Sequence, residues 1–106
     1  MILPSSVKSI ERYAFASNYK IQSVNIPDGV TSIGSSAFNS CLALQSITIP
    51  KNVESIGAEA FRDSSISEIT ILTNKITSIE NQAFLNCKFT SINIPNSVKS
   101  IGEMAF

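Results

Sequence analysis

The sequence predicts a repeat solenoid that is mainly β, with one short parallel strand in each coil and a curled, 3₁₀-like or short extended segment after it. Three observations predict this fold class. The dipeptide Ala-Phe occurs five times, and its Phe residues are 23, 23, 23 and 22 positions apart. An aliphatic residue and an Ile precede each Ala-Phe in the same rhythm. Proline marks a further position of the unit. These landmarks are Val7, Val30, Val53, Ile76 and Val98; Ile10, Ile33, Ile56, Ile79 and Ile101; Phe15, Phe38, Phe61, Phe84 and Phe106; and Pro4, Pro27, Pro50 and Pro95.

The strand of each unit is clearest in the segment Leu44–Ile49. There β-branched residues alternate with polar ones, which is typical of a strand with one buried face, so Ile47 and Ile49 are expected to point inward. Pro50 has no N–H and should end this strand at a corner. The following spacing of Val53, Ile56 and Ala60 is closer to turns of a curled segment than to a strand.

Small deviations from the repeat length support stacking. Phe61 to Ile71 takes ten steps where Phe38 to Ile49 takes eleven, but the corner after Ile71 is one residue longer and restores the count. This compensation is expected if Val53 and Ile76 must lie one above the other while the loops vary.

The chain of 106 residues has room for one small domain, and we expect a single array over residues 1–106 of about four and a half units. It starts and stops within a unit, so the sequence predicts a fragment of a longer array, or a domain whose end coils are covered by a neighbour. Its uncovered end coils favour end-to-end self-association.

These motifs resemble the BspA-like leucine-rich repeat family, whose unit reads L-x-x-I-x-I-P-x-x-V-x-x-I-G-x-x-A-F-x-x-C. The unit Leu44–Phe61 follows that pattern closely. Departures are Leu72 at a Pro position and Glu11 and Glu80 at the Gly position. The resemblance implies a leucine-rich-repeat right-handed superhelix. It also implies a secreted or cell-surface protein with a role in adhesion.

Composition excludes several function classes. Eight Lys and Arg against eight Asp and Glu leave no net charge, which argues against nucleic acid as a partner. Without His, the chain cannot assemble a Ser-His-Asp triad or an imidazole zinc site. No apolar run approaches the length of a transmembrane segment, and the start of the chain has no signal peptide. Because the chain lacks the residues of these catalytic and metal sites, we expect no catalytic residue, no metal and no cofactor, and hence no enzyme.

Cys41 and Cys87 are the residues with the most evident reactivity. They occupy equivalent positions two coils apart, about 10 Å from strand spacing, which exceeds the roughly 7 Å limit for a disulfide. Asn18 and Ser64 fill the same position in other units. We interpret it as a place for a small buried side chain.

A serine precedes the inward Ile of every unit. Without His, and with no Lys or carboxylate at a matching position in every unit, we expect these hydroxyls to form turn or inter-coil hydrogen bonds. They are Ser9, Ser32, Ser55, Ser78 and Ser100.

The outward positions of the strands form the candidate partner-binding face. If the strands pair side by side, these small polar residues form two columns that could bind a protein or a glycan through many modest hydrogen bonds. A solvated strand surface is the alternative, because the face lacks Trp, Tyr and Arg anchors. Tyr13 and Tyr19 suggest a second patch in the first coil, or simply its edge. The candidate face consists of Ser23, Asn25, Ser46, Thr48, Glu68, Thr70, Ser91 and Asn93.

Two functions follow as hypotheses. The first is a non-catalytic recognition module of the adhesin kind that presents this face to a protein or host surface. The second is an intracellular scaffold or regulatory repeat protein, which unpaired cysteines and the missing signal peptide would suit.

Overall fold

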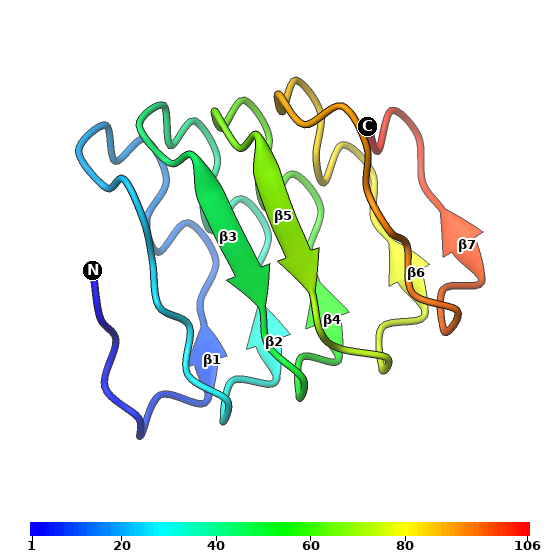
Figure 1. Ribbon diagram of the computed structural model, residues 1–106, viewed down its shortest axis with the longest axis horizontal. Coiled ribbons are helices and arrows are strands. Elements are labelled where there is room, and N and C mark those ends of the chain that lie inside the picture. Colours follow the sequence, from blue (N-terminus) through cyan, green and yellow to red (C-terminus); the bar gives the residue numbers. More distant parts are fainter.

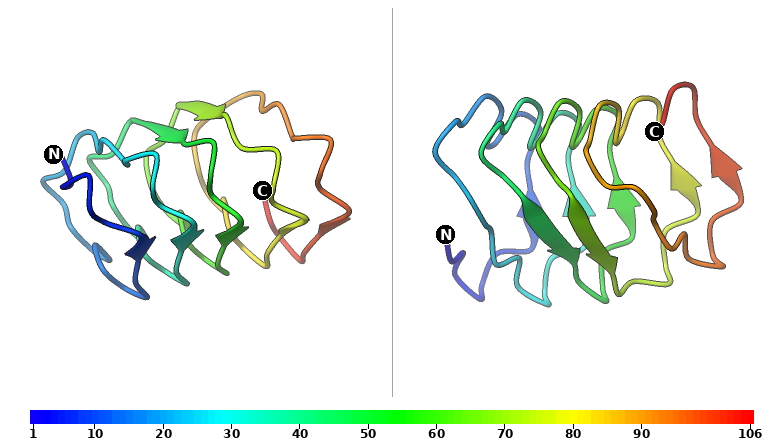
Figure 2. Two further views of the ribbon diagram at one scale, coloured as in Figure 1. Left: turned by 90° about the horizontal axis from the view of Figure 1, so that it is seen from below. Right: turned by 45° about the horizontal axis from the view of Figure 1, so that its top comes forward.

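The computed structural model describes residues 1–106 and shows a stack of coils 32 × 28 × 21 Å in extent (Figure 1). Successive coils follow one another along the long axis with similar outlines, as both views of Figure 2 show. The structure contains seven short strands and no helix. All strand pairs are parallel, which is expected when each coil returns the chain to the same starting side.

One side of the stack, which we call the Ser-Ile side, carries a two-residue strand from each coil. Strands β1, β2 and β4 form one sheet in that order, and β6 pairs with β7 in another. The bounds are β1 Ser9–Ile10, β2 Ser32–Ile33, β4 Ser55–Ile56, β6 Ser78–Ile79 and β7 Ser100–Ile101.

The opposite side, the long-strand side, holds β3 (Ser46–Ile49) and β5 (Glu68–Ile71). These strands pair over four residues, and β3 ends at Ile49 directly before Pro50, as predicted. Leu72 occupies the next Pro position and donates its N–H to the Ile49 carbonyl at 2.9 Å, a bond that proline could not make.

The phenylalanines of the Ala-Phe dipeptides form one continuous column, which confirms the predicted stacking. The rings of Phe38, Phe61 and Phe84 are fully buried, with neighbouring centroids 5.3 and 5.4 Å apart and nearly parallel planes. Phe15 and Phe106 extend the column at its two ends, at 5.3 and 5.7 Å. Val53 and Ile76 are both fully buried, as their matched positions predicted.

The turns that carry this column form a third edge of the stack, the turn ridge. Backbone hydrogen bonds join it from coil to coil, for example from Phe38 N to Ala60 O and from Phe61 N to Ala83 O. Two positions in nearly every turn adopt positive φ without being glycine, including Glu59 and Asp63, both at 59°. The predicted curled segment is therefore a series of tight turns and not a 3₁₀ helix.

The longer corner after β5 is held by Thr73, whose side chain is buried. Its hydroxyl donates to the Val53 carbonyl at 2.6 Å and accepts from the Lys75 N–H at 3.1 Å. These two bonds replace contacts that the regular corner would make, which explains why the insertion does not disturb the stack.

On the Ser-Ile side, strand pairing correlates with the type of residue that comes directly after each Ser-Ile dipeptide. Where that residue is Gly34, Gly57 or Gly102, the strand pairs with the strand of the preceding coil. A Cβ on Gly57 would lie 2.5 Å from Ser35 N, so the backbones approach too closely for any side chain. At Glu80 a Cβ is present, and β6 does not pair with β4.

Candidate functional site

All eight residues of the candidate face are exposed to solvent, and they lie on the long-strand side. The structure pairs only part of the two predicted columns. Ser46 lies opposite Glu68 and Thr48 opposite Thr70, in the ladder between β3 and β5. The other four candidate residues lie in extended segments that do not pair with β3 or β5. They are Ser23, Asn25, Ser91 and Asn93.

The condition for two continuous columns, side-by-side pairing of all the strands, is therefore met only between β3 and β5. The segment 23–26 pairs with the start of the chain, through Met1 N to Ser23 O and Asn25 N to Met1 O, each 2.8 Å. Its opposite edge, toward β3, makes no ladder. Close approach at Gly57 on the Ser-Ile side holds the same two coils together there, and the long-strand side of that interface opens.

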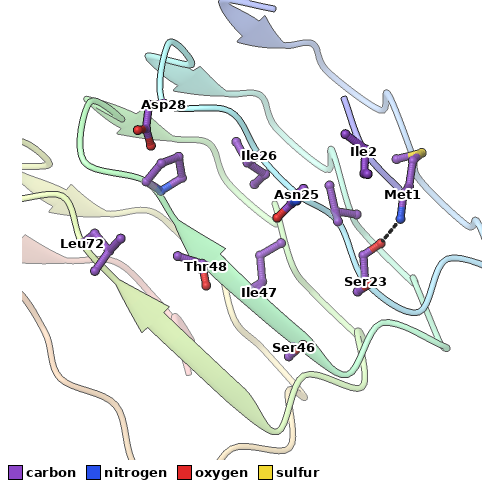
Figure 3. A pocket seen from close by; sticks show the side chains of 12 residues that line it. Met1, Ile2, Ser23, Asn25, Ile26, Asp28, Ser46, Ile47, Thr48 and Leu72 are labelled. Carbon is purple, nitrogen blue, oxygen red and sulfur yellow. Dashed lines mark hydrogen bonds between the residues drawn. The ribbon is translucent and has the colours of Figure 1, made fainter. Parts of the chain in front are cut away.

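A hollow of about 420 Å³ lies over this opening (Figure 3). Ser23 and Asn25 line it from one strand and Ser46 and Thr48 from β3, so four of the eight candidate residues meet there. Exposed apolar side chains lie at its margins: Ile2 is 81% exposed and Leu72 is 58% exposed. Asp28 is the one charged side chain in the lining.

The hollow is lined by donors and acceptors with an apolar margin and offers no pair of groups for acid–base or nucleophilic chemistry. Its chemistry suits non-covalent recognition. Sequence reasoning located the polar floor but missed Leu72 and Asp28. The departure of Leu72 from the Pro position was the available signal.

The cysteine position proves to be a hydrogen-bonding position as well as a small buried one. Cys41 and Cys87 each donate their S–H to a phenylalanine carbonyl 26 residues earlier, Phe15 and Phe61, at 3.1 Å. Ser64 does the same to Phe38 O at 2.7 Å. Both cysteines are free thiols.

We expect Ser64→Ala to lower the free energy of unfolding by about 1 kcal/mol, because the Phe38 carbonyl loses the shorter of its two hydrogen bonds and keeps the one from Cys41 N at 3.3 Å. The control is Ser65→Ala, whose partly exposed hydroxyl donates to Leu42 O at 2.6 Å and can be replaced by water. That variant should cost less than about 0.5 kcal/mol. Urea titration measures both, and equal losses would contradict the role given to Ser64.

Burial raises the pKa of Cys87 to about 12 from the ordinary 9.0, with a smaller contribution from the Asp63 carboxylate. Since the folded pKa lies above the unfolded one, this group's stabilisation is complete below pH 9 and disappears as pH rises toward 12. Wild type should therefore lose more stability than Cys87→Ser between these values, measured by chemical denaturation. Parallel curves for the two proteins would contradict this.

The serine column takes part in both of the expected kinds of hydrogen bond, inter-coil and local. The serines begin the Ser-Ile strands and pair between coils through their backbones. Two hydroxyls bond within their own coil, Ser9 to Glu11 at 2.8 Å and Ser78 to Glu80 at 2.7 Å. The other three serines have no carboxylate partner, so no base recurs along the column.

The turn ridge carries a polar cluster that the sequence did not reveal. Arg62 donates to Gln82 at 2.8 Å and forms ion pairs with Glu59 at 3.2 Å and Asp63 at 3.4 Å. These side chains are about one third exposed, so the ion pairs contribute little net free energy. Near the first coil, the Arg12 guanidinium lies 5.3 Å from the Tyr13 ring centre, and Tyr13 and Tyr19 are exposed.

No three His, Cys, Asp or Glu side chains lie close enough together to hold a metal ion. The structure has no helix of the length and apolar character required to cross a bilayer.

Comparison with known proteins agrees with this fold. The chain matches the BspA type leucine rich repeat region over residues 1–106. It is similar to the crystal structure of the leucine-rich repeat protein TpLRR of T. pallidum, with a TM-score of 0.86 and 27% identity over 94% of this chain and 47% of that one. It is also similar to a leucine-rich repeat protein of Eubacterium ventriosum, with a TM-score of 0.59 and 25% identity over 99% of this chain and 41% of that one. No curated protein matches the sequence.

The chain thus spans less than half the length of either solved relative. The match along the whole sequence, the Ala-Phe column and the parallel strands of successive coils agree with one another. The chain belongs to the BspA-type leucine-rich repeat family.

Proposed function

We propose that this protein is a non-catalytic recognition module of the adhesin kind, which binds a protein or a glycan on a cell surface or in a host matrix. Leucine-rich repeats of this type are protein-interaction modules. The observation that carries the proposal is the outward face of β3 and β5, where Ser46, Thr48, Glu68 and Thr70 stand exposed in register and hold no structural contact of their own.

Secretion or cell-surface display is part of the same proposal and rests on membership of the family. The absence of enzymatic activity rests on the chemistry of the chain. Without histidine, and with an alkaline thiol pKa for Cys87, the chain lacks an imidazole base and a thiolate at neutral pH.

Charged substitutions on the face test the proposal. Thr48→Lys and Thr70→Lys should change binding to immobilised matrix proteins or to glycans on an array by at least about tenfold, because each places a solvated charge where the partner must dehydrate the face. The control is Thr77→Lys, an exposed threonine next to β6 on the Ser-Ile side. Circular dichroism checks that all three variants fold. Equal binding by the variants and wild type would exclude this face.

Two free thiols favour a second candidate, an intracellular scaffold or regulatory repeat protein. The sequence context of the segment distinguishes the two. An export signal or surface anchor in the same polypeptide would support the recognition module, and a fused signalling domain would support the scaffold.

A further inference from the structure

We infer that the opening between segment 23–26 and β3, which we call the β3 gap, binds one extended peptide strand of a partner protein through backbone hydrogen bonds. This inference rests on the proposed function and specifies the partner's chemistry: an extended segment with β-branched or small residues and a Lys or Arg near one end.

On one edge of the gap, segment 23–26 has backbone groups that form no hydrogen bond with β3. Val24 uses neither its backbone N–H nor its C=O in a hydrogen bond, and the N–H of Ile26 is also unpaired. Val24 as a whole residue is 7% exposed and lines the hollow, so its backbone groups have no partner in the chain and are available to a guest. The only bond joining the two strands lies at their start, from Gln45 N to Gln22 O at 3.3 Å.

The other edge of the gap is the free edge of β3. In a parallel ladder, alternate residues of a strand bond to opposite neighbours. The carbonyls of Gln45 and Ile49 accept from β5 and the residue after it, so the odd-numbered residues serve that side. The backbone groups of Ser46 and Thr48 are left facing the β3 gap.

The hollow over the gap offers polar groups from both strands to such a guest. Its volume of about 420 Å³ lies within the range of roughly 300–1,000 Å³ that is usual for ligand sites. Figure 3 shows Asn25 and Ser23 on one side of it and Thr48 and Ser46 on the other. A strand in this place would find donors and acceptors on both of its edges, which is the arrangement of strand addition.

Side chains around the hollow select the peptide. Ile2 and Leu72 offer exposed apolar surface to alternate side chains of an extended segment. Asp28 carries the only charged side chain of the lining and lies beyond the end of segment 23–26, while the Met1 ammonium in the same lining is already bonded to Ser23 O, so a cationic residue at one end of the peptide would be paired with Asp28. A glycan would gain little here, since no aromatic ring is present for a sugar face.

The experiment selects binders from a display library of random short peptides on the full chain, and then compares each binder with a synthetic twin methylated at alternate backbone nitrogens. We expect β-rich peptides with a Lys or Arg, at least about tenfold weaker binding by the methylated twin, and slower amide exchange at Val24, Ile26, Ser46 and Thr48 in the complex. Asp28→Asn should weaken binding about threefold.

Thr48→Pro is the matched variant. It removes a donor from the gap and no bond to β5, and proline is tolerated on such an edge. It should abolish peptide binding, while Thr70→Lys, which lies outside the hollow, should not. The inference would be overturned if no peptide were selected, or if the methylated and unmethylated twins bound with equal affinity. It would also be overturned if the selected peptides left the four amides unprotected in the complex. The proposed function would then still be judged by the effect of Thr70→Lys on matrix or glycan binding.

Discussion

Phe61→Ala should lower the free energy of unfolding by about 3–5 kcal/mol, the largest loss expected from any single truncation in this chain. Phe61 is fully buried and is the middle ring of the column, in contact with Phe38 at 5.3 Å and Phe84 at 5.4 Å. Removing it leaves a cavity and also separates the coils on either side, whose cooperation keeps a solenoid folded.

Urea denaturation followed by circular dichroism measures this loss. The control is Phe106→Ala, which removes the same side chain from the end of the column. Phe106 is 44% exposed and stacks on Phe84 alone, with Phe89 at its edge, so we expect a loss of about 1 kcal/mol. Similar losses for the two variants would mean that the column does not transmit stability between coils.

Gly57→Ala should destabilise the chain by about 2 kcal/mol or more, although it adds a single methyl group. Its Cβ would lie 2.5 Å from Ser35 N and 2.8 Å from Ser35 Cα, atoms of a backbone that cannot turn aside like a side chain. The coils would have to separate, and the pairing of Ser32–Ile33 with Ser55–Ile56 would be lost, as it is where Glu80 follows β6.

Gly29→Ala is the matched control, because the nearest atom to its Cβ is the mobile end of Lys8 at 3.1 Å. It should change stability by less than about 0.5 kcal/mol. Thermal unfolding compares the variants, and amide exchange at Glu54 and Gly57, which donate to the preceding coil, reports the pairing directly. Retained protection at both amides in Gly57→Ala would contradict the steric argument.

Much of the architecture could be predicted from spacing alone. Phe61, Val53 and Pro50 recur at fixed intervals, and a residue that recurs once per coil must lie above its predecessor if the coils stack. The compensating deletion and insertion around Ile71 also predicted that the coils stack. The buried Thr73 shows how the longer corner is accommodated. The alternation in Leu44–Ile49 likewise predicted which side chains of β3 are exposed.

Structural features that depend on distances between coils could not be predicted from the sequence. Glu80 was visible as a departure from Gly, but its consequence is a lost pairing between β4 and β6 that no spacing displays. The positive φ of Glu59 has no signature in the sequence, because this residue type rarely adopts that conformation. The β3 gap was missed for a related reason, since Ser23 and Ser46 are identical in type and phase whether or not their strands pair.

The sequence by itself therefore determined the repeat, the inward columns, the exposed residues of the long-strand side and the family, because each follows from order along the chain. Tertiary structure alone decided which strands pair, that Leu72 and Asp28 line the hollow beside its polar floor, and that Ser64 and the cysteines bond phenylalanine carbonyls. These features depend on how closely two backbones approach. The presence or absence of a Cβ at Gly57 and Glu80 changes the distance between neighbouring backbones, while the repeat in the sequence stays the same.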